Sequence, residues 1–362
     1  MSFSDPAAPS SLHALGWDDA WAEAARAVDH ADDYDPARVT RVDRGLCTVM
    51  GEHGVERVGA SGHVLEASAA EPADAPCVGD WVLVRGWPDD RRTLEHVLPR
   101  RSCVLRAQIG GSSHGQALAA NVTIAAIVAG LDQQPSMTKL ERLVSLAWGS
   151  GAEPMVILTK ADIAADADDV VADVAGAVPG AEVMACSVVD GRGIADLRTR
   201  LGVGTLALLG SSGAGKSTLV NEMVGADVLL TREIRADGRG RHTSVRRELV
   251  VLPSGGCVID TPGIRGVALA AGSEGLAATF SDVDELAAEC KFNDCSHETE
   301  PDCAVAEAIA TGALSARRLE SWRKLQREVA YMERRTDARR RQAELRVWKQ
   351  RTKEHRGSAK RR

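Results

Sequence analysis

Residues 210–218, GSSGAGKST, have the composition and spacing of a phosphate-binding loop. The pattern G-x-x-x-x-G-K-[ST] is matched between an apolar run and a helical segment. Glycines let backbone N–H groups converge on phosphate oxygens, and the N-terminus of the following helix adds positive potential. We expect Lys216 to contact the β- and γ-phosphates as a catalytic residue, and Ser217 to bind Mg²⁺. The expected phosphate contacts are Gly210, Ser211, Ser212, Gly213, Ala214, Gly215, Lys216, Ser217 and Thr218.

A second element with metal-binding chemistry follows the phosphate loop. The sequence LVVLPSGGCVIDTPG predicts two strands, of which the second ends at Asp260 and is followed by Gly263. An aspartate at a strand end binds Mg²⁺ in this class of site, and the backbone N–H of the glycine contacts the γ-phosphate. Asp260 and Gly263 are therefore predicted to complete the phosphate and magnesium site.

A glycine-rich basic segment, GRGRHTS at residues 238–244, lies between these two elements. Its position is that of a nucleotide-dependent switch. We expect Thr243 or Ser244 to bind the magnesium ion when the γ-phosphate is present. The alternative is a solvated loop with no catalytic role.

Two elements upstream of the phosphate loop predict that the bound base is guanine. The strand PMVILTK leads into Thr159-Lys160-Ala161-Asp162, which resembles the N-K-x-D motif of GTPases. The Asp162 carboxylate is suited to accept hydrogen bonds from guanine N1–H and the N2 amine, which adenine does not offer. Lys160 is expected to pack over the base, and Thr159 stands where the motif has asparagine.

The second guanine element is Cys186-Ser187-Val188, at the end of a further apolar run. It resembles the S-A element whose backbone contacts the guanine carbonyl. Both elements precede the phosphate loop, whereas in ordinary Ras-like domains they follow it. The same sheet results if the old termini are joined and the chain is opened before the guanine strands. We therefore predict a circularly permuted GTPase domain.

Three cysteines and a histidine predict a metal site nearer the C-terminus. Cys290, Cys295, His297 and Cys303 have the spacing C-x₄-C-x-H-x₅-C. Three thiolates and an imidazole suit one tetrahedral Zn²⁺ in a closed, structural site. The segment has little apolar content, so bound metal is expected to supply its folding free energy. The alternative is a coincidental group of thiols and an exposed histidine. The five other cysteines are interpreted as buried reduced thiols.

The apolar pattern predicts the parts that position these groups. Short alternating runs within residues 37–105, including RVTRV, CTVM, ERVGA, GHVLEA and GDWVLVRG, predict a small barrel or sandwich. Apolar runs alternate with helical stretches in residues 106–275, which predicts a doubly wound α/β domain. Residues 1–36 are predicted to be a partly ordered extension, and residues 276–362 a zinc-binding domain with a basic helical tail.

Composition and charge indicate the surroundings in which the protein works. The 362 residues are 44% hydrophobic and 26% charged, as in ordinary globular proteins, and no apolar run is long enough to span a bilayer. The N-terminus lacks the pattern of a secretory signal. We expect a cytoplasmic monomer that does not bind membranes.

The last 46 residues carry an uneven share of the charge. They contain 18 Lys and Arg against 6 Asp and Glu, while the whole chain has a net charge of −7. A basic tail on an acidic body favours RNA as the partner, and a solvated charged helix is the alternative. Apolar residues at helical spacing predict the packing face of this tail: Leu319, Trp322, Leu325, Val329 and Met332.

Taken together, GSSGAGKS, GRGRHTS, DTPG, the T-K-A-D and C-S-V elements and the Cys/His spacing resemble one family. It is the family of ribosome small-subunit-dependent GTPases, called RsgA or YjeQ, and the resemblance covers about residues 37–350. It implies that the barrel is an OB-fold, that the partner is the small ribosomal subunit with its rRNA late in assembly, and that the subunit stimulates the hydrolysis of GTP to GDP.

The resemblance also implies a catalytic histidine. Ile264 stands where Ras-like proteins have a water-positioning glutamine, and an apolar side chain cannot orient water. The family has a hydrophobic residue there and uses the histidine of its G-R-H-T-T-T segment, which matches His242. Here Thr243-Ser244-Val245 replaces the threonine run, so the hydroxyls of Thr243 and Ser244 are both candidates for binding magnesium.

Two other functions are compatible with the same motifs. One is a GTPase with a non-ribosomal target, such as a membrane or metal-delivery system. The other is a zinc-dependent RNA-binding module in which the nucleotide is a structural ligand only.

Overall fold

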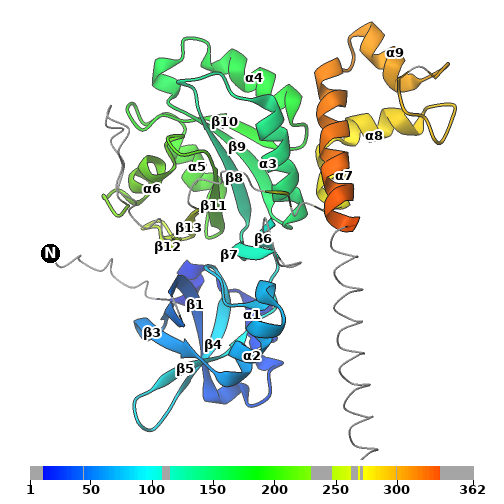
Figure 1. Ribbon diagram of the computed structural model, residues 1–362. Helices are drawn as coiled ribbons and strands as arrows, with labels where there is room; N and C mark the ends of the chain where they lie inside the picture. Colours follow the sequence, from blue (N-terminus) through cyan, green and yellow to red (C-terminus); the bar gives the residue numbers. More distant parts are fainter. Residues whose placement is uncertain are drawn as a thin grey trace, which may run out of the picture.

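The computed structural model describes residues 11–43, 45–107, 115–229, 247–261, 268–269, 272–298 and 300–334. Figure 1 shows a small barrel, a layered α/β domain, and a group of helices beside that domain. This arrangement confirms the multidomain fold class predicted from the sequence. Within the described ranges, every helix is too short or too polar to cross a membrane.

Five strands close the barrel in the order β1-β2-β3-β5-β4. They are β1 (Tyr34–Asp43), β2 (Leu46–Gly51), β3 (Gly54–Ala60), β4 (Trp81–Gly86) and β5 (Arg92–Val97). Apolar side chains at alternating positions fill the interior, as small closed barrels require. Those with almost no exposed surface are Val39, Val49, Val58, Val82, Val84 and Leu94.

One element of the barrel differs from the prediction. Residues 62–67, GHVLEA, were expected to form a strand but belong to the helix α2 (Gly62–Ala70), which the 3-10 turn η3 (Pro72–Asp74) follows. The segment ends in Ala67 and continues into Ser-Ala-Ala, and alanine has the highest helix propensity. Only Val64 of α2 is buried, so no alternating pattern of contacts holds the segment in a sheet.

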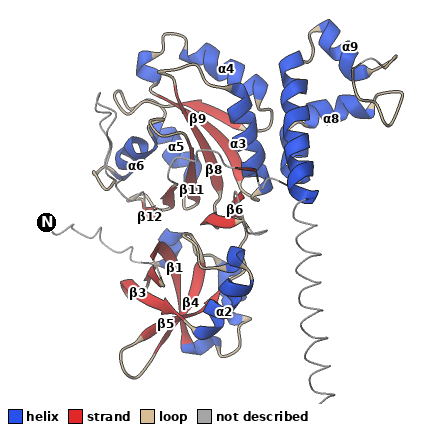
Figure 2. Cartoon of the chain, viewed as in Figure 1, coloured by secondary structure: helices blue, strands red, loops and turns tan. Residues whose placement is uncertain are grey.

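The α/β domain contains a six-stranded sheet in the order β10-β9-β8-β11-β13-β12. Figure 2 shows its strands in red among helices in blue. All neighbouring strands are parallel except β12, which pairs antiparallel with β13. The strands are β8 (Ile124–Gly130), β9 (Glu153–Thr159), β10 (Glu182–Ala185), β11 (Thr205–Gly210), β12 (Glu248–Val251) and β13 (Cys257–Asp260).

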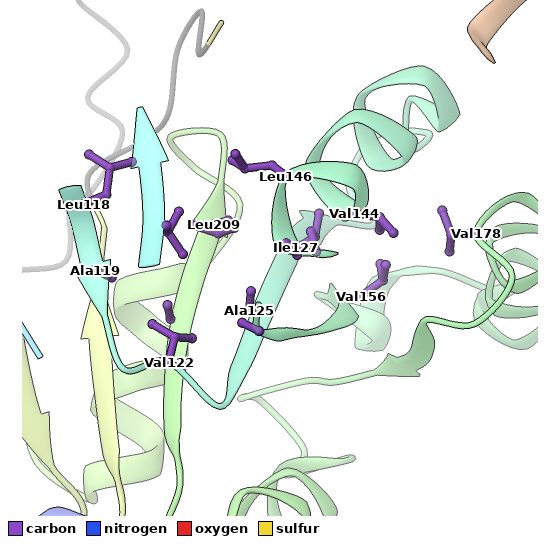
Figure 3. Packing of buried hydrophobic residues seen from close by; sticks show 14 of the residues in the cluster. Leu118, Ala119, Val122, Ala125, Ile127, Val144, Leu146, Val156, Val178 and Leu209 are labelled. Atoms are coloured by element: carbon purple, nitrogen blue, oxygen red, sulfur yellow. The ribbon is translucent and has the colours of Figure 1, made fainter. Parts of the chain in front are cut away.

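Helices cover both faces of this sheet, which explains why its strands are almost continuously apolar. The helices are α3 (Met137–Gly149), α4 (Ala167–Ala177), α5 (Ile194–Leu201) and α6 (Lys216–Val224), with the 3-10 turn η4 (Ala161–Ile163) after β9. Alternate residues of β8 point to opposite faces. Ala125 and Ile127 pack with Val144 of α3 (Figure 3), whereas Ile124 and Ala126 pack with residues of α5 and α6.

A small sheet joins the barrel to this domain. Its strands are β6 (Cys103–Ala107), β7 (Gln116–Ala120) and β14 (Ala268–Leu269), in the order β14-β6-β7. Ala120 N–H donates to the Val78 carbonyl of the barrel at 2.9 Å. The small sheet therefore contacts the barrel at the point where the chain enters β8.

The segment before the barrel packs against both the barrel and the sheet. It contains η1 (Leu12–Leu15), α1 (Asp19–Arg26) and η2 (Ala31–Asp33). Trp17 meets Trp81 of β4 edge-on, with ring centroids 4.7 Å apart. The Ala14 carbonyl accepts a hydrogen bond from Gly256 N–H, in the turn between β12 and β13, at 3.1 Å.

Helices follow the α/β domain and pack beside α3 (Figure 1). They are α7 (Ser273–Thr279), α8 (Ser281–Ala288), α9 (Ala304–Thr311) and a helix over 316–334. Arg318 in the last of these is 4% exposed and bonds Glu141 of α3, which is fully buried. Of the predicted apolar face, Leu319, Trp322, Leu325 and Val329 are buried, and Met332 is half-buried.

Candidate nucleotide and metal sites

The phosphate loop connects the central strand β11 to helix α6, as the sequence predicted. Lys216 is the first residue of α6 and its side chain folds back over the loop. Its ammonium donates to the carbonyls of Gly210 at 3.1 Å and Ser211 at 2.8 Å. Burial lowers the pKa of Lys216, and the nearby Asp260 opposes this shift. Phosphate oxygens at this position would favour the charged ammonium.

Two predicted magnesium ligands meet beside this loop. The Ser217 hydroxyl donates to Asp260 Oδ2 at 3.1 Å, because β13 lies next to β11 in the sheet. Asp260 Oδ1 is buried and has no hydrogen-bond partner among the described residues. Burial raises the pKa of Asp260. A hydroxyl and a carboxylate with an unpartnered oxygen are the hard ligands that Mg²⁺ prefers, so the residues present fit this ion.

The predicted guanine element at the end of β9 is bonded directly to the phosphate loop. The Thr159 hydroxyl donates to the Ala214 carbonyl at 2.7 Å. Gly215 has a φ of 87°, and a Cβ there would lie 3.2 Å from Thr159 Oγ1. Threonine therefore braces the loop from the position where N-K-x-D has asparagine.

The predicted guanine-reading carboxylate is held by the second guanine element. The Ser187 hydroxyl donates to Asp162 Oδ1 at 2.7 Å, and the same serine oxygen accepts from Val189 N–H at 3.1 Å. Val188 lies between them, beyond the end of β10. Thr159, Asp162 and Ser187 are thus gathered at the carboxyl ends of β9 and β10, the edge at which β11 leads into the phosphate loop.

One charged residue of this edge was missed in the sequence. Asp132 follows β8 and its Oδ2 lies 2.7 Å from the ammonium of Lys160. Its position in the sequence could have indicated it. Asp132 lies two residues beyond a predicted buried strand, and that strand is next to the predicted guanine strand. Carboxyl ends of neighbouring parallel strands meet at one edge of a sheet.

Four predicted site residues lie outside the described residues. They are Gly263 and the switch residues His242, Thr243 and Ser244. The remaining predicted residues of the loop, Ser212, Gly213 and Thr218, are exposed at the same edge as Lys216.

The predicted metal ligands come together in the C-terminal helices. Cys290 follows α8 and Cys303 precedes α9, with Cys295 and His297 in the connection between them. One ligand atom from each of the four residues lies within 4.8 Å of the others. Burial lowers the pKa of His297, which favours the neutral imidazole that binds metals. The cluster is therefore suited to hold one metal ion.

The RsgA GTPase family model matches residues 97–270. The small ribosomal subunit biogenesis GTPase RsgA of Streptomyces coelicolor is 45% identical over 341 residues, which covers 93% of this chain and 91% of that protein. The chain belongs to the RsgA GTPase family. The protein of the same description from Opitutus terrae is 40% identical over 351 residues, covering 94% and 95% of the two chains.

Solved structures show the same fold. The crystal structure of YjeQ from Thermotoga maritima aligns with a TM-score of 0.59 at 23% identity, over 82% of this chain and 99% of that one. The structure described as YloQ, a circularly permuted GTPase, also gives a TM-score of 0.59, over 84% and 97% of the two chains. The predicted resemblance, the permuted order and the assignment as a GTP-hydrolysing enzyme are confirmed.

Proposed function

We propose that this GTPase acts in the biogenesis of the small ribosomal subunit and binds that subunit in a nucleotide-dependent way. The observation that carries the nucleotide part is the direct bonding of the guanine elements to the phosphate loop, through Thr159 and Ala214. The ribosomal part is supported by the descriptions of relatives that match over 93% and 94% of this chain. Release requires that the GTP and GDP forms differ in affinity for the subunit.

Each predicted residue has a role in this scheme. The backbone of residues 210–218 binds the phosphates, and Asp162 selects guanine. Ser217 and Asp260 would hold Mg²⁺, which neutralises charge on the β- and γ-phosphates when it is bound. Lys216 stabilises the same charge through its ammonium group.

The remaining roles fall on residues outside the described ranges. His242 orients the attacking water, in a position where Ile264 cannot. Thr243 or Ser244 adds a hydroxyl ligand to magnesium, and the Gly263 N–H contacts the γ-phosphate. These assignments rest on the order of the motifs and on their match to the family pattern.

Zinc is the metal that the Cys/His cluster fits best. A tetrahedral ion bonded to sulfur at about 2.3 Å and to nitrogen at about 2.0 Å separates its ligand atoms by about 3.5 to 3.8 Å. The Sγ atoms of Cys290 and Cys303 are 3.8 Å apart, and they lie 3.5 and 3.6 Å from His297 Nδ1. Cys295 would complete a closed structural site.

The outer face of the helix over 316–334 supports rRNA as the contact. Lys324, Arg327, Tyr331 and Arg334 follow one another at intervals of three or four residues, so they share one face, and all are exposed. Tyr331 is 57% exposed. Within the described ranges, neither Lys324 nor Arg327 forms an ion pair. Cations flanking an exposed aromatic ring suit phosphates and a stacked base. We place a monomer in the cytoplasm, where such RNA is found.

The guanine assignment is tested by exchanging the base that is read. An Asp162→Asn protein has a carboxamide that no longer accepts two hydrogen bonds from guanine but donates to the extra carbonyl of xanthine. We expect about 100-fold weaker GTP binding and a gain for xanthosine triphosphate. Unchanged preference for GTP would contradict the assignment.

The ribosomal assignment is tested by GTP turnover with and without purified small subunits. Stimulation that is lost in His242→Ala, while nucleotide affinity is kept, supports both the target and the histidine. In parallel, Lys324→Glu/Arg327→Glu should weaken co-sedimentation with the subunit and reduce its salt dependence. Turnover that ignores the subunit would remove the ribosome as the partner.

A further inference from the structure

Lys160, the residue predicted to pack over guanine, is held in an unusual conformation. Its backbone has a φ of 62° and a ψ of 35°, in the left-handed region that residues with side chains rarely adopt. It connects β9 to η4, directly before the Asp162 segment. Neighbouring groups must therefore stabilise the backbone of this residue.

Asp132 bonds the far end of the lysine side chain. Its Oδ2 lies 2.7 Å from Lys160 Nζ, and the two side chains are 41% and 31% exposed. Leu131 N–H, one residue earlier, donates to the Thr159 carbonyl at 2.9 Å. The segment after β8 is thus attached at two points to the guanine element after β9.

Gly130 provides the space for this contact. A Cβ at residue 130 would lie 2.5 Å from Asp132 Oδ1 and 3.4 Å from Cε of Lys160. The lysine stem therefore passes across the backbone at the end of β8, where any larger residue would push the carboxylate away. Gly130, Asp132 and Lys160 form one arrangement, which we call the lysine clip.

We propose that Asp132 is a positioning residue for nucleotide binding: it fixes Lys160 so that the lysine stem is already in place to receive the guanine base. The proposal rests on the proposed guanine role of the T-K-A-D element. A free lysine side chain loses much rotational freedom when a ligand orders it, and fixing it beforehand removes that loss from the binding step. The exposed ion pair itself adds little to folding.

The test measures the dissociation constants of fluorescent GDP and GTP analogues with the full-length protein. Asp132→Asn should bind both nucleotides about tenfold more weakly, the factor expected when a rotamer-rich side chain must be ordered on binding. Asp132→Glu should recover part of this loss. Gly130→Ala should weaken binding as Asp132→Asn does, without a further loss in the double variant.

A double-mutant cycle separates positioning from a structural effect. Lys160→Met keeps the apolar stem but removes the ammonium, so Asp132→Asn should have no additional effect in that background. The matched control is Glu182→Gln, at the start of β10. This change removes a similarly exposed partner from Arg200. It should leave nucleotide affinity unchanged, and the thermal midpoint should be the same in all these variants.

The outcomes distinguish this proposal from the proposed function. If Asp132→Asn binds nucleotide like the wild type while Asp162→Asn loses GTP, Asp132 has no positioning role and the guanine site stands. If Asp132→Asn weakens binding equally with and without the Lys160 ammonium, the clip is also wrong. If Asp162→Asn still prefers GTP, the guanine site itself is wrong.

Discussion

The two junctions that attach flanking parts to the α/β domain are each built around a buried arginine, but the arginines have different partners. Arg38 of the barrel is 1% exposed and donates to backbone carbonyls of Leu15, Gly79 and Asn121. Arg318 is 4% exposed and bonds two carboxylates. The barrel junction bonds its cation with backbone carbonyls, whereas the C-terminal junction adds two carboxylates to the carbonyls of Ala177 and Thr279.

The groups around Arg38 illustrate how the barrel junction stabilises a buried charge. Burial lowers the pKa of Arg38, while Cys257 and Asp80 favour its charged form. Asp80 is itself bonded by Arg100 at 2.7 Å on both oxygens. The positive charge of Arg38 is therefore shared among several neutral acceptors.

At the C-terminal junction, a single residue, Arg318, forms several bonds to charged groups. Arg318 donates to Asp282 at 2.5 and 2.7 Å and to Glu141 at 3.2 Å. It also lies over the Phe280 ring, 4.7 Å from the centroid. Glu141 is fully buried and is bonded by Arg317 as well, so loss of Arg318 removes one of its two cations together with the pair to Asp282. We infer that the C-terminal junction depends more on charged partners than the barrel junction does.

Removing the metal should have the largest effect on this comparison. Structural zinc sites of this ligand type contribute about 10 kcal/mol or more to folding, and only the C-terminal side has such a cluster among the described residues. A chelator should therefore increase hydrogen exchange in residues 290–311 and leave the barrel strands protected. Equal loss of protection in the barrel would show that the two junctions are coupled.

Arg318→Met should be the most destabilising single change at either junction. Breaking a buried ion pair from one side costs about 3 to 5 kcal/mol. Urea unfolding followed by circular dichroism measures this cost. Arg317→Met is the matched control, because Arg317 bonds the same Glu141 but is 41% exposed, and it should cost less than about 1 kcal/mol. Similar costs for the two would refute the importance of burial.

Arg38→Met should cost less than Arg318→Met. It leaves backbone carbonyls without one donor, and each such loss costs about 1 kcal/mol. We expect a total of about 1 to 3 kcal/mol in the same unfolding experiment. Arg41→Met, on the same strand but 30% exposed, should change stability little. A cost for Arg38 above that for Arg318 would reverse the comparison.

Asp18 should give the smallest effect, with a defined pH dependence. Its hydrogen bond from Arg101, helped by Trp21 N–H, lowers the pKa from 3.8 to about 2 against the effect of burial. A lowered folded pKa stabilises the protein above about pH 4, and this contribution is lost as the pH falls toward 2.

The measurement compares the wild type with Asp18→Asn across this range. We expect a difference of less than about 1 kcal/mol at pH 6, because the pair is half exposed. The difference in thermal midpoint should shrink between pH 4 and pH 3. A constant difference would mean that the ion pair contributes nothing.

Local patterns predicted most of the α/β domain. The strands β8, β9 and β11 are continuous apolar runs, and the phosphate loop is a contiguous motif, so neighbouring residues alone specify them. Helix α2 was mistaken for a strand because its short segment has one buried position and no clear period.

Contacts between distant segments could not be predicted. Glu141 sits in an amphipathic helix and is indistinguishable in sequence from a solvated glutamate, since its partner Arg318 is 177 positions away. Asp132 reaches Lys160 only because two strands lie side by side. The same limit applies to the brace from Thr159 to Ala214, which are 55 positions apart.

The order of strands in the sheet also determines how the nascent chain acquires its nucleotide site. β8, β9 and β10 are synthesised first and form one flank, while β11, β13 and β12 form the other. Until β11 leaves the ribosome, β8 has an open edge of unpaired backbone groups. β11 fills this edge and brings the phosphate loop beside the predicted guanine elements, which are synthesised before it. During synthesis the phosphate loop therefore follows the strands that precede it, and the predicted magnesium ligand Asp260 is added only later, with β13.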